Sequence, residues 1–259
     1  MRNREASERS ALTSRFATNL MDILDRVEYR RVDLANRRDP VYRLRYAAYR
    51  REEWVSENPE GIATDEYDRS PNARCYGVYI DGQLVSSVRF HHATPDMRIS
   101  PCMRMYPDLL NGFLDAGQSY IDPSRFTTDR DTALAYPALP FLTLRVAAMA
   151  CEYFTATYCL SAVREEHVAF YRRVFGSREI AGDGHYPGLN FPVKLYAAEV
   201  REIRNRVADR FPFFMSTPEE REAMFGDDAD AHYLGLIRPT ARQAALAEDR
   251  FSPVPDAAE

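Results

Sequence analysis

Lysine, cysteine and long apolar runs are scarce in this sequence. Only one of the 34 basic residues is a lysine, Lys194, so Schiff-base or P-loop chemistry has a single candidate. The four cysteines lie far apart, with no Cys-x-x-Cys pair and no histidine at zinc-ligand spacing, so we expect free thiols and no bound metal. No apolar run reaches the roughly 20 residues of a membrane-spanning helix, and the first residues lack a signal-peptide core. We therefore expect a cytoplasmic protein without a membrane span.

Charge and composition exclude further classes of protein. The chain has 259 residues, 39 acidic against 34 basic side chains, and a formal net charge of −5. This balance argues against a nucleic-acid partner, because phosphate binding needs a basic face. A hydrophobic fraction of 45% with 12% aromatic residues excludes wholesale disorder and is typical of a globular protein.

Hydrophobic periodicity and turn signals predict an alternation of strands and helices. Asp81-Gly82 separates two β-rich segments and predicts a hairpin, because a type I′ turn needs positive φ at both positions. The predicted helices cover residues 12–27, 39–51, 139–157, 164–175 and 199–210. The predicted strands cover residues 75–80, 83–91, 118–121, 158–163 and 192–200. Hairpin strands followed by alternating strand and helix predict an α/β (α+β) fold, with a mixed sheet and helices on both faces.

Four short motifs, in this order along the chain, carry a family resemblance. They are Leu-Arg-Tyr-Ala-Ala-Tyr at 44–49 followed by Trp54, Asp-Glu-Tyr-Asp at 65–68, Val-Arg-Phe at 88–90, and Ser-Arg-Phe at 124–126. The series resembles the signature of the acyl-homoserine-lactone synthases, and at least as well that of the long-chain N-acyl amino acid synthases. The resemblance covers roughly residues 40–200.

The resemblance implies a GNAT fold, in which a mostly antiparallel sheet has a V-shaped splay, and transfer of a fatty acyl group to an amine. It divides the chain into an N-terminal helix and strand extension (1–35), a GNAT-like acyltransferase domain (36–210) and a C-terminal helical extension with a tail (211–259). The positions that match the motifs, with an implied catalytic or substrate-binding role, are Arg45, Trp54, Asp65, Asp68, Arg89, Ser124, Arg125 and Phe126.

One departure concerns the general base. The homoserine-lactone synthases have a glutamate two residues before the Ser-Arg pair, and this chain has Asp122, which is one methylene shorter. Asp122 is a candidate to accept the proton that the amine loses. The alternative is a structural carboxylate that accepts hydrogen bonds from loose backbone N–H groups. A bulge at 123–126 would turn the N–H groups of Ser124 and Arg125 toward the oxyanion.

The acidic and arginine residues of the motifs have two interpretations. Arginine binds a carboxylate in bidentate fashion and a carboxylate binds an ammonium group, so Arg45, Arg89, Asp65 and Asp68 suit an α-amino acid acceptor. Alternatively, the four pair with one another and hold the N-terminal region over the sheet. Trp54, the only tryptophan, is either a core residue or part of a pocket wall.

The segment before the longest predicted helix bears on the acyl donor. Residues 125–139 contain no glycine, whereas acetyl-CoA-dependent members of this fold use a glycine-rich loop there to hold pyrophosphate. We therefore expect acyl carrier protein rather than CoA as donor, and no cofactor beyond this co-substrate. The arginines that could dock an acidic carrier protein are Arg172, Arg173 and Arg178, with Arg201 and Arg204; a solvated helix face is the alternative. The candidate acyl-pocket residues are Leu142, Val146 and Met149.

The leading prediction is an acyltransferase that makes a long-chain N-acyl amino acid from an acyl-carrier-protein thioester. The first alternative is an acyl-homoserine-lactone (autoinducer) synthase that uses S-adenosylmethionine. The second is a non-catalytic lipid or amino acid sensor on the same fold. Oligomeric state is left open by the sequence.

Overall fold

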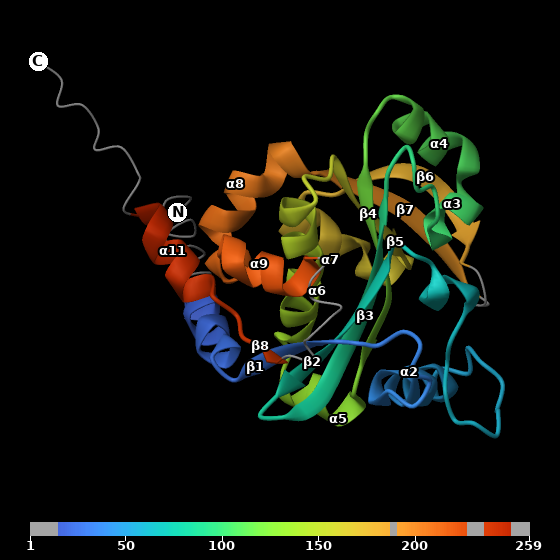
Figure 1. Cartoon of the computed structure of the whole chain (residues 1–259), viewed down its shortest axis with the longest axis horizontal. Helices are drawn as coiled ribbons and strands as arrows, with labels where there is room; N and C mark the ends of the chain where they lie inside the picture. Colours follow the sequence, from blue (N-terminus) through green and yellow to red (C-terminus); the bar gives the residue numbers. More distant parts are fainter. Residues whose placement is uncertain (1–14, 187–190, 227–235, 250–259) are drawn as a thin grey trace, which may run out of the picture.

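An eight-stranded mixed sheet organises the chain, with the strand order β6-β7-β5-β4-β3-β2-β1-β8 (Figure 1). The computed structural model describes residues 15–186, 191–226 and 236–249. Only the β4–β5 pairing is parallel among the described strands. The strands are β1 (Val27–Arg31), β2 (Ala73–Ile80), β3 (Gln83–Ala93), β4 (Tyr120–Thr128), β5 (Tyr158–Val163), β6 (Arg178–His185), β7 (Pro192–Glu199) and β8 (Leu236–Ile237). This confirms the predicted fold class.

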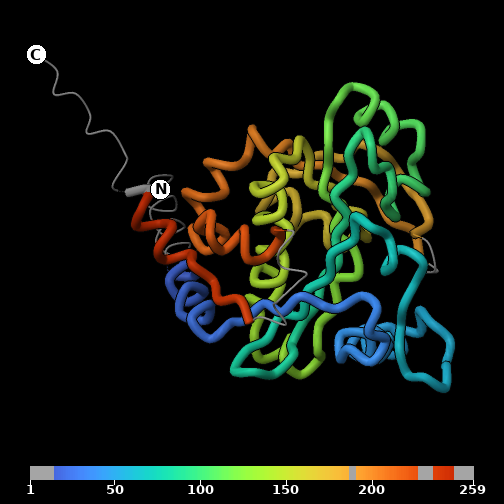
Figure 2. Tube along the Cα trace, in the orientation of Figure 1, coloured from blue at the N-terminus to red at the C-terminus, as the bar shows by residue number. Residues whose placement is uncertain are grey.

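Helices cover both faces of the sheet (Figures 1 and 2). On one side lie α6, α8 and α9, together with a helix through residues 15–24, and on the other lies α2. The helices are α2 (Pro40–Arg51), α3 (Pro101–Met105), α4 (Pro107–Asp115), α5 (Arg130–Ala135), α6 (Leu139–Tyr153), α7 (Glu165–Phe175), α8 (Val200–Arg210), α9 (Pro218–Phe225) and α11 (Ala241–Asp249), with short 3-10 helices η1 (Glu66–Arg69) and η2 (Pro212–Phe214). No helix among the described residues is long and apolar enough to cross a membrane.

Local sequence signals account for several of these boundaries. The β2–β3 hairpin turns at Asp81 and Gly82, which have φ of 51° and 79°, as the predicted type I′ turn requires. Helix α2 begins after Asp39, whose carboxylate accepts a hydrogen bond from the N–H of Val41. Helix α7 ends at Gly176 in the left-handed region, with φ of 61°.

Strand β4 is longer than predicted. The expected strand stopped at Ile121 because Pro123 cannot donate a ladder hydrogen bond, yet β4 continues to Thr128, with Pro123 opposite Phe90 of β3. The proline is tolerated because β4 and β5 pair only at Tyr120 and Ile121, so that β4 has a free edge beyond this point. The two strands therefore splay apart at Pro123.

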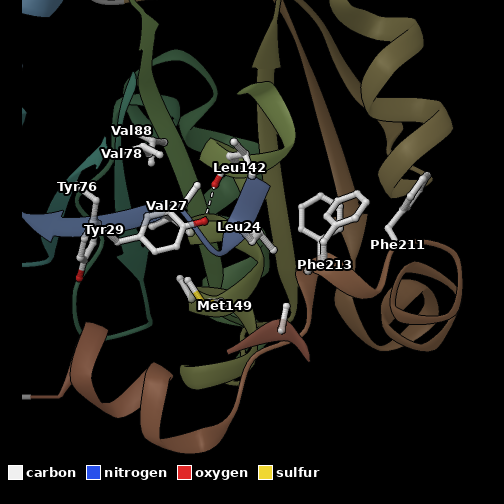
Figure 3. Packing of buried hydrophobic residues seen from close by; sticks show 14 of the residues in the cluster. Leu24, Val27, Tyr29, Tyr76, Val78, Val88, Leu142, Met149, Phe211 and Phe213 are labelled. Carbon is white, nitrogen blue, oxygen red and sulfur yellow. Dashed lines mark hydrogen bonds between the residues drawn. The ribbon is translucent and has the colours of Figure 1, made fainter. Parts of the chain in front are cut away.

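The main apolar core lies between the sheet and helix α6 (Figure 3). Tyr29 of β1 is fully buried there, and its hydroxyl donates a hydrogen bond to the carbonyl of Leu142 at 2.9 Å. The N-terminal segment thus belongs to the same core as α6. Of the expected C-terminal extension and tail at 211–259, residues 227–235 and 250–259 lie outside the described residues.

Candidate active site

A β-bulge in β4 forms the centre of the candidate site. Ser124 lies opposite Arg89, while Arg125 and Phe126 together face the single residue Val88. Arg125 has φ of 53°, a left-handed conformation that costs a non-glycine residue about 1–3 kcal/mol. The predicted bulge is therefore present, at the point where β4 and β5 separate. Strained backbone of this kind is common at functional sites.

Five charged side chains form a continuous ion network over this bulge. The Arg45 guanidinium contacts Asp68 at 2.8 Å, and Arg89 contacts the same Asp68 oxygen at 2.8 Å. Arg89 also donates to Asp65 at 2.5 Å and to the Ser124 hydroxyl at 3.1 Å. Arg125 completes the network with two hydrogen bonds to Asp65, at 2.5 and 2.9 Å. The motif residues are thus brought together, and they pair with one another as the structural alternative expected.

Both carboxylates of the network stay ionised. Burial alone would raise the pKa of Asp65, but Arg89 and Arg125 outweigh it and hold this pKa well below its ordinary value. Burial likewise opposes ionisation of Asp68, and Arg45 and Arg89 lower its pKa. Three guanidinium groups against two carboxylates leave the network with one excess positive charge. The network is therefore suited to an additional anionic group.

Asp122 occupies a different position from the network. Its side chain is fully buried, and its two oxygens accept hydrogen bonds from the backbone N–H of Cys102 at 2.9 Å and from the Cys102 thiol at 3.1 Å. Burial raises the pKa of Asp122. These contacts hold the beginning of α3 and match the structural alternative for this residue. The shorter side chain thus ends at α3 instead of reaching across the bulge.

The sequence gives no signal for Tyr186, which follows β6 and lies beside the bulge. Its ring lies 5.5 Å from the Arg125 guanidinium, and the side chain is 6% exposed. The hydroxyl lies near Ser124 and has no hydrogen bond of ordinary geometry among the described residues. Burial raises the pKa of Tyr186, so the phenol is neutral and can donate. Its loop position, without a flanking motif, explains why sequence reasoning missed it.

A cavity of 470 Å³ lies on the α2 side of the bulge, and we call it the α2-side cavity. Asp65 and Arg125 of the ion network line it, together with Tyr49 of α2. Trp54 packs beside Tyr49, with a ring distance of 5.9 Å, and under the Arg164 guanidinium at 4.9 Å. The ion network is therefore reachable from this side.

A second cavity, the α6-side cavity, has a volume of 320 Å³ and is mostly apolar. It begins at Pro123 and at Leu160 and Ser161 of β5, where the sheet splays, and continues between α6, α7 and α8. The α6 residues that line it are Leu144, Ala147, Ala148, Cys151 and Glu152. The α6-side cavity thus reaches β4 at Pro123, next to the bulge, and the α2-side cavity reaches it at Arg125 within the bulge.

The candidate acyl-pocket residues lie elsewhere on α6. Leu142, Val146 and Met149 are fully buried in the main core (Figure 3 labels Leu142 and Met149), and none of them lines the α6-side cavity in the described part of the chain. Phe126 is half-buried in the bulge. The candidate carrier-docking residues Arg172, Arg173 and Arg178 are exposed, and Arg178 pairs with Glu202 at 3.2 Å. Among the described residues, no cluster of histidine, cysteine or carboxylate side chains is arranged to hold a metal.

We expect His91 to make the stability of the fold pH-dependent. Burial, followed by the nearby Arg89, lowers the pKa of His91 to about 3, while its ordinary value is about 6.5. Between these values the unfolded chain binds more protons, so stability is lost as the pH falls from about 6.5 toward 3. At pH 5 the loss from this residue is about 2 kcal/mol. Urea unfolding at pH 7 and pH 5 measures it.

The matched variants are His91→Gln and, on an exposed helix position, His167→Gln. The first should reduce the difference between the two pH values, and the second should leave it unchanged. An equal pH dependence in His91→Gln and in the unmodified protein would show that other groups cause it.

The splayed mixed sheet and the bulge agree with the GNAT-type N-acyltransferase fold that the sequence motifs predict. The family model for N-acyl amino acid synthase FeeM matches residues 40–199. The chain therefore belongs to the FeeM family of N-acyl amino acid synthases. No curated protein matches this sequence.

Solved structures agree with this fold. FeeM, an N-acyl amino acid synthase from uncultured soil microbes, is 18% identical with a TM-score of 0.57, over 71% of this chain and 97% of FeeM. The acyl-homoserine-lactone synthase LasI is 15% identical with a TM-score of 0.50, over 66% of this chain and 88% of LasI. MesI, a CoA-dependent acyl-homoserine-lactone synthase, is 17% identical with a TM-score of 0.50, over 77% of this chain and 99% of MesI.

Proposed function

We propose that the protein transfers a fatty acyl group from a thioester, carried by acyl carrier protein, to the α-amine of an amino acid. The observation that carries this proposal is the position of the bulge between an ionic and an apolar cavity. The α6-side cavity suits an acyl chain, and the α2-side cavity, with Asp65 and Arg125 in its wall, suits a small polar acceptor. The thioester carbonyl would lie at the splay, where both substrates reach it.

The excess positive charge of the ion network favours an amino acid acceptor. A substrate carboxylate would neutralise this charge by binding Arg125. Arg125 and Asp65 are the two residues of the network that line the α2-side cavity. S-adenosylmethionine carries the same α-carboxylate, but its sulfonium would bring a further positive charge beside the network. Asp122 is hydrogen-bonded to Cys102 and does not line the α2-side cavity, so Asp65 is the network carboxylate that an acceptor would meet there.

For the chemical step, we assign oxyanion stabilisation to the backbone N–H groups of Ser124 and Arg125 and to the neutral phenol of Tyr186. Preorganised donors of this kind contribute about 3–4 kcal/mol each to transition-state stabilisation. The attacking amine must first lose a proton. Asp122 is tied to Cys102, and the lowered pKa of Asp65 makes this carboxylate a poor base, so we propose that the amine loses its proton to solvent and enters the site in its neutral form.

The donor assignment rests on a missing phosphate-binding loop and on surface charge. Residues 125–139 contain no glycine, and α6 begins without a side-chain cap. Helices α7 and α8, which help to enclose the α6-side cavity, carry exposed arginines. An acidic carrier protein would be attracted to these arginines.

Product analysis tests the function directly. The protein is produced in a bacterial host and organic extracts are examined by mass spectrometry, followed by assays of the purified protein with palmitoyl-carrier protein or palmitoyl-CoA and a mixture of amino acids. N-acyl amino acids formed from the carrier-protein thioester are the expected result. Acyl-homoserine lactones would establish the autoinducer alternative, turnover of the CoA thioester alone would overturn the donor assignment, and ligand binding without any product would establish a sensor.

A further inference from the structure

The far wall of the α6-side cavity comes from the C-terminal segment of the chain, beyond the residues that match the family model. The wall residues of this segment are Phe214, Met215, Ser216, Thr217, Pro218, Arg221, Ala244 and Ala247. At its opposite end the cavity reaches Pro123 and Ser161 at the splay. The cavity thus connects the reaction centre to a wall that is built outside the family's common region.

Most of the cavity wall is apolar, which suits an apolar tail. Its charged wall residues are engaged with other groups: Glu152 pairs with Arg204 at 3.4 Å, and Arg221 donates to the carbonyl and the hydroxyl of Ser216. The side chains that α11 contributes, Ala244 and Ala247, are the smallest that an ordinary helix residue can present. Ala244 is buried and Ala247 is exposed at the rim.

Buried polar contacts hold α11 against this wall. Arg145 of α6 and Glu220 of α9 form an ion pair at 2.5 Å with both side chains fully buried. The same Glu220 accepts hydrogen bonds from the N–H and the hydroxyl of Thr240, directly before α11, at 2.8 and 2.6 Å. On its other side, Arg242 of α11 pairs with Asp22 of the helix through residues 15–24 and with Asp25 directly after that helix. The wall is therefore fixed in place.

We propose that α11 limits the length of the acyl chain that the enzyme accepts, with Ala244 and Ala247 as specificity-determining residues. This inference rests on the proposed function, because it takes the occupant of the cavity to be a fatty acyl chain. A longer side chain at Ala244 would fill the far end of the cavity, and one at the exposed Ala247 would close its rim. Both would exclude the last carbons of a long chain, while shorter chains would still fit.

The test compares Ala244→Phe and Ala247→Trp with Gln243→Phe, which adds a ring at an exposed position of α11 outside the cavity wall. Binding of saturated fatty acids from octanoate to stearate is measured by calorimetry, and the acyl chains of the products are measured by mass spectrometry. Both cavity variants should bind stearate at least 10-fold more weakly and shift products to shorter chains, with octanoate binding unchanged. Gln243→Phe should behave as the unmodified protein does.

The outcomes separate the two levels of the proposal. Unchanged length profiles in a folded Ala244→Phe and in Ala247→Trp would overturn the role of α11 and leave the acyltransferase proposal intact. If Ala244→Phe fails to fold, the exposed position of Ala247 still decides the question. If the unmodified protein binds none of the fatty acids, the acyl occupant itself is wrong and both proposals fail.

Discussion

Replacing Arg145 with methionine should lower the free energy of unfolding by about 3–5 kcal/mol, the cost of leaving one charge of a buried pair without its partner. Arg145 is fully buried and holds Glu220 through two hydrogen bonds, at 2.5 and 2.9 Å. It also donates to the carbonyls of Phe213 and Met215, which would lose a partner at the same time. Urea unfolding of the variant measures the loss.

Two comparisons identify the cause of that loss. In the exposed pair of Arg104 and Glu66, Arg104→Met should cost less than about 1 kcal/mol, because water solvates the remaining charge. The double variant of Arg145 and Glu220 to methionine should be destabilised by less than the sum of the two single variants, since it leaves no buried charge. Strict additivity would mean that the pair is not coupled.

Replacing Arg125 with glutamine should reduce kcat/KM for the acceptor amino acid by about 10²-fold, because the variant loses a charge-assisted hydrogen bond to the substrate carboxylate. The stability should change little, because Asp65 keeps its contacts with Arg89. We expect the larger effect in KM for the acceptor. Steady-state kinetics with varied acceptor and saturating acyl thioester measures the effect.

Two variants control for backbone and position. Arg125→Gly removes the side chain but relieves the positive φ, so it should lose as much activity as the glutamine variant and be at least as stable. Arg130→Gln changes an exposed arginine nearby and should have no effect. An unchanged acceptor KM in Arg125→Gln would assign the residue to the structure alone. Arg89→Ala cannot make this distinction, because fully buried Arg89 holds both carboxylates of the network.

Elements with a strong local signal were predictable from the sequence. The Asp81-Gly82 turn, the α7 end at Gly176 and strand β5 follow from turn chemistry and short apolar runs. Strand β6 was missed because Arg178–His185 contains two glycines and three charged residues, and it becomes a strand by pairing with β7. The extension of β4 across Pro123 depends on the splay, which no local pattern encodes.

The site was predictable only as a set of residues. Motif order identified the members of the ion network, but their pairing depends on where β3, β4 and η1 meet. Helix α6 is buried nearly all round, so its periodicity does not indicate which face borders the α6-side cavity. The predicted acyl-pocket residue Leu142 therefore lies in the main core, while Leu144 lines the cavity. Tyr186 and α11 come from distant parts of the chain, and only the fold brings Tyr186 to the bulge and α11 to the α6-side cavity.

The pairing of β8 with β1 has a consequence for synthesis on the ribosome. Strand β1 is synthesised early, because it lies near the beginning of the sequence. Its outer edge is covered only after Leu236 and Ile237 of β8 have emerged from the ribosome, about 200 residues later. Until then the nascent protein presents an open strand edge, which favours unwanted association. Truncation before β8 would make that vulnerable stage permanent.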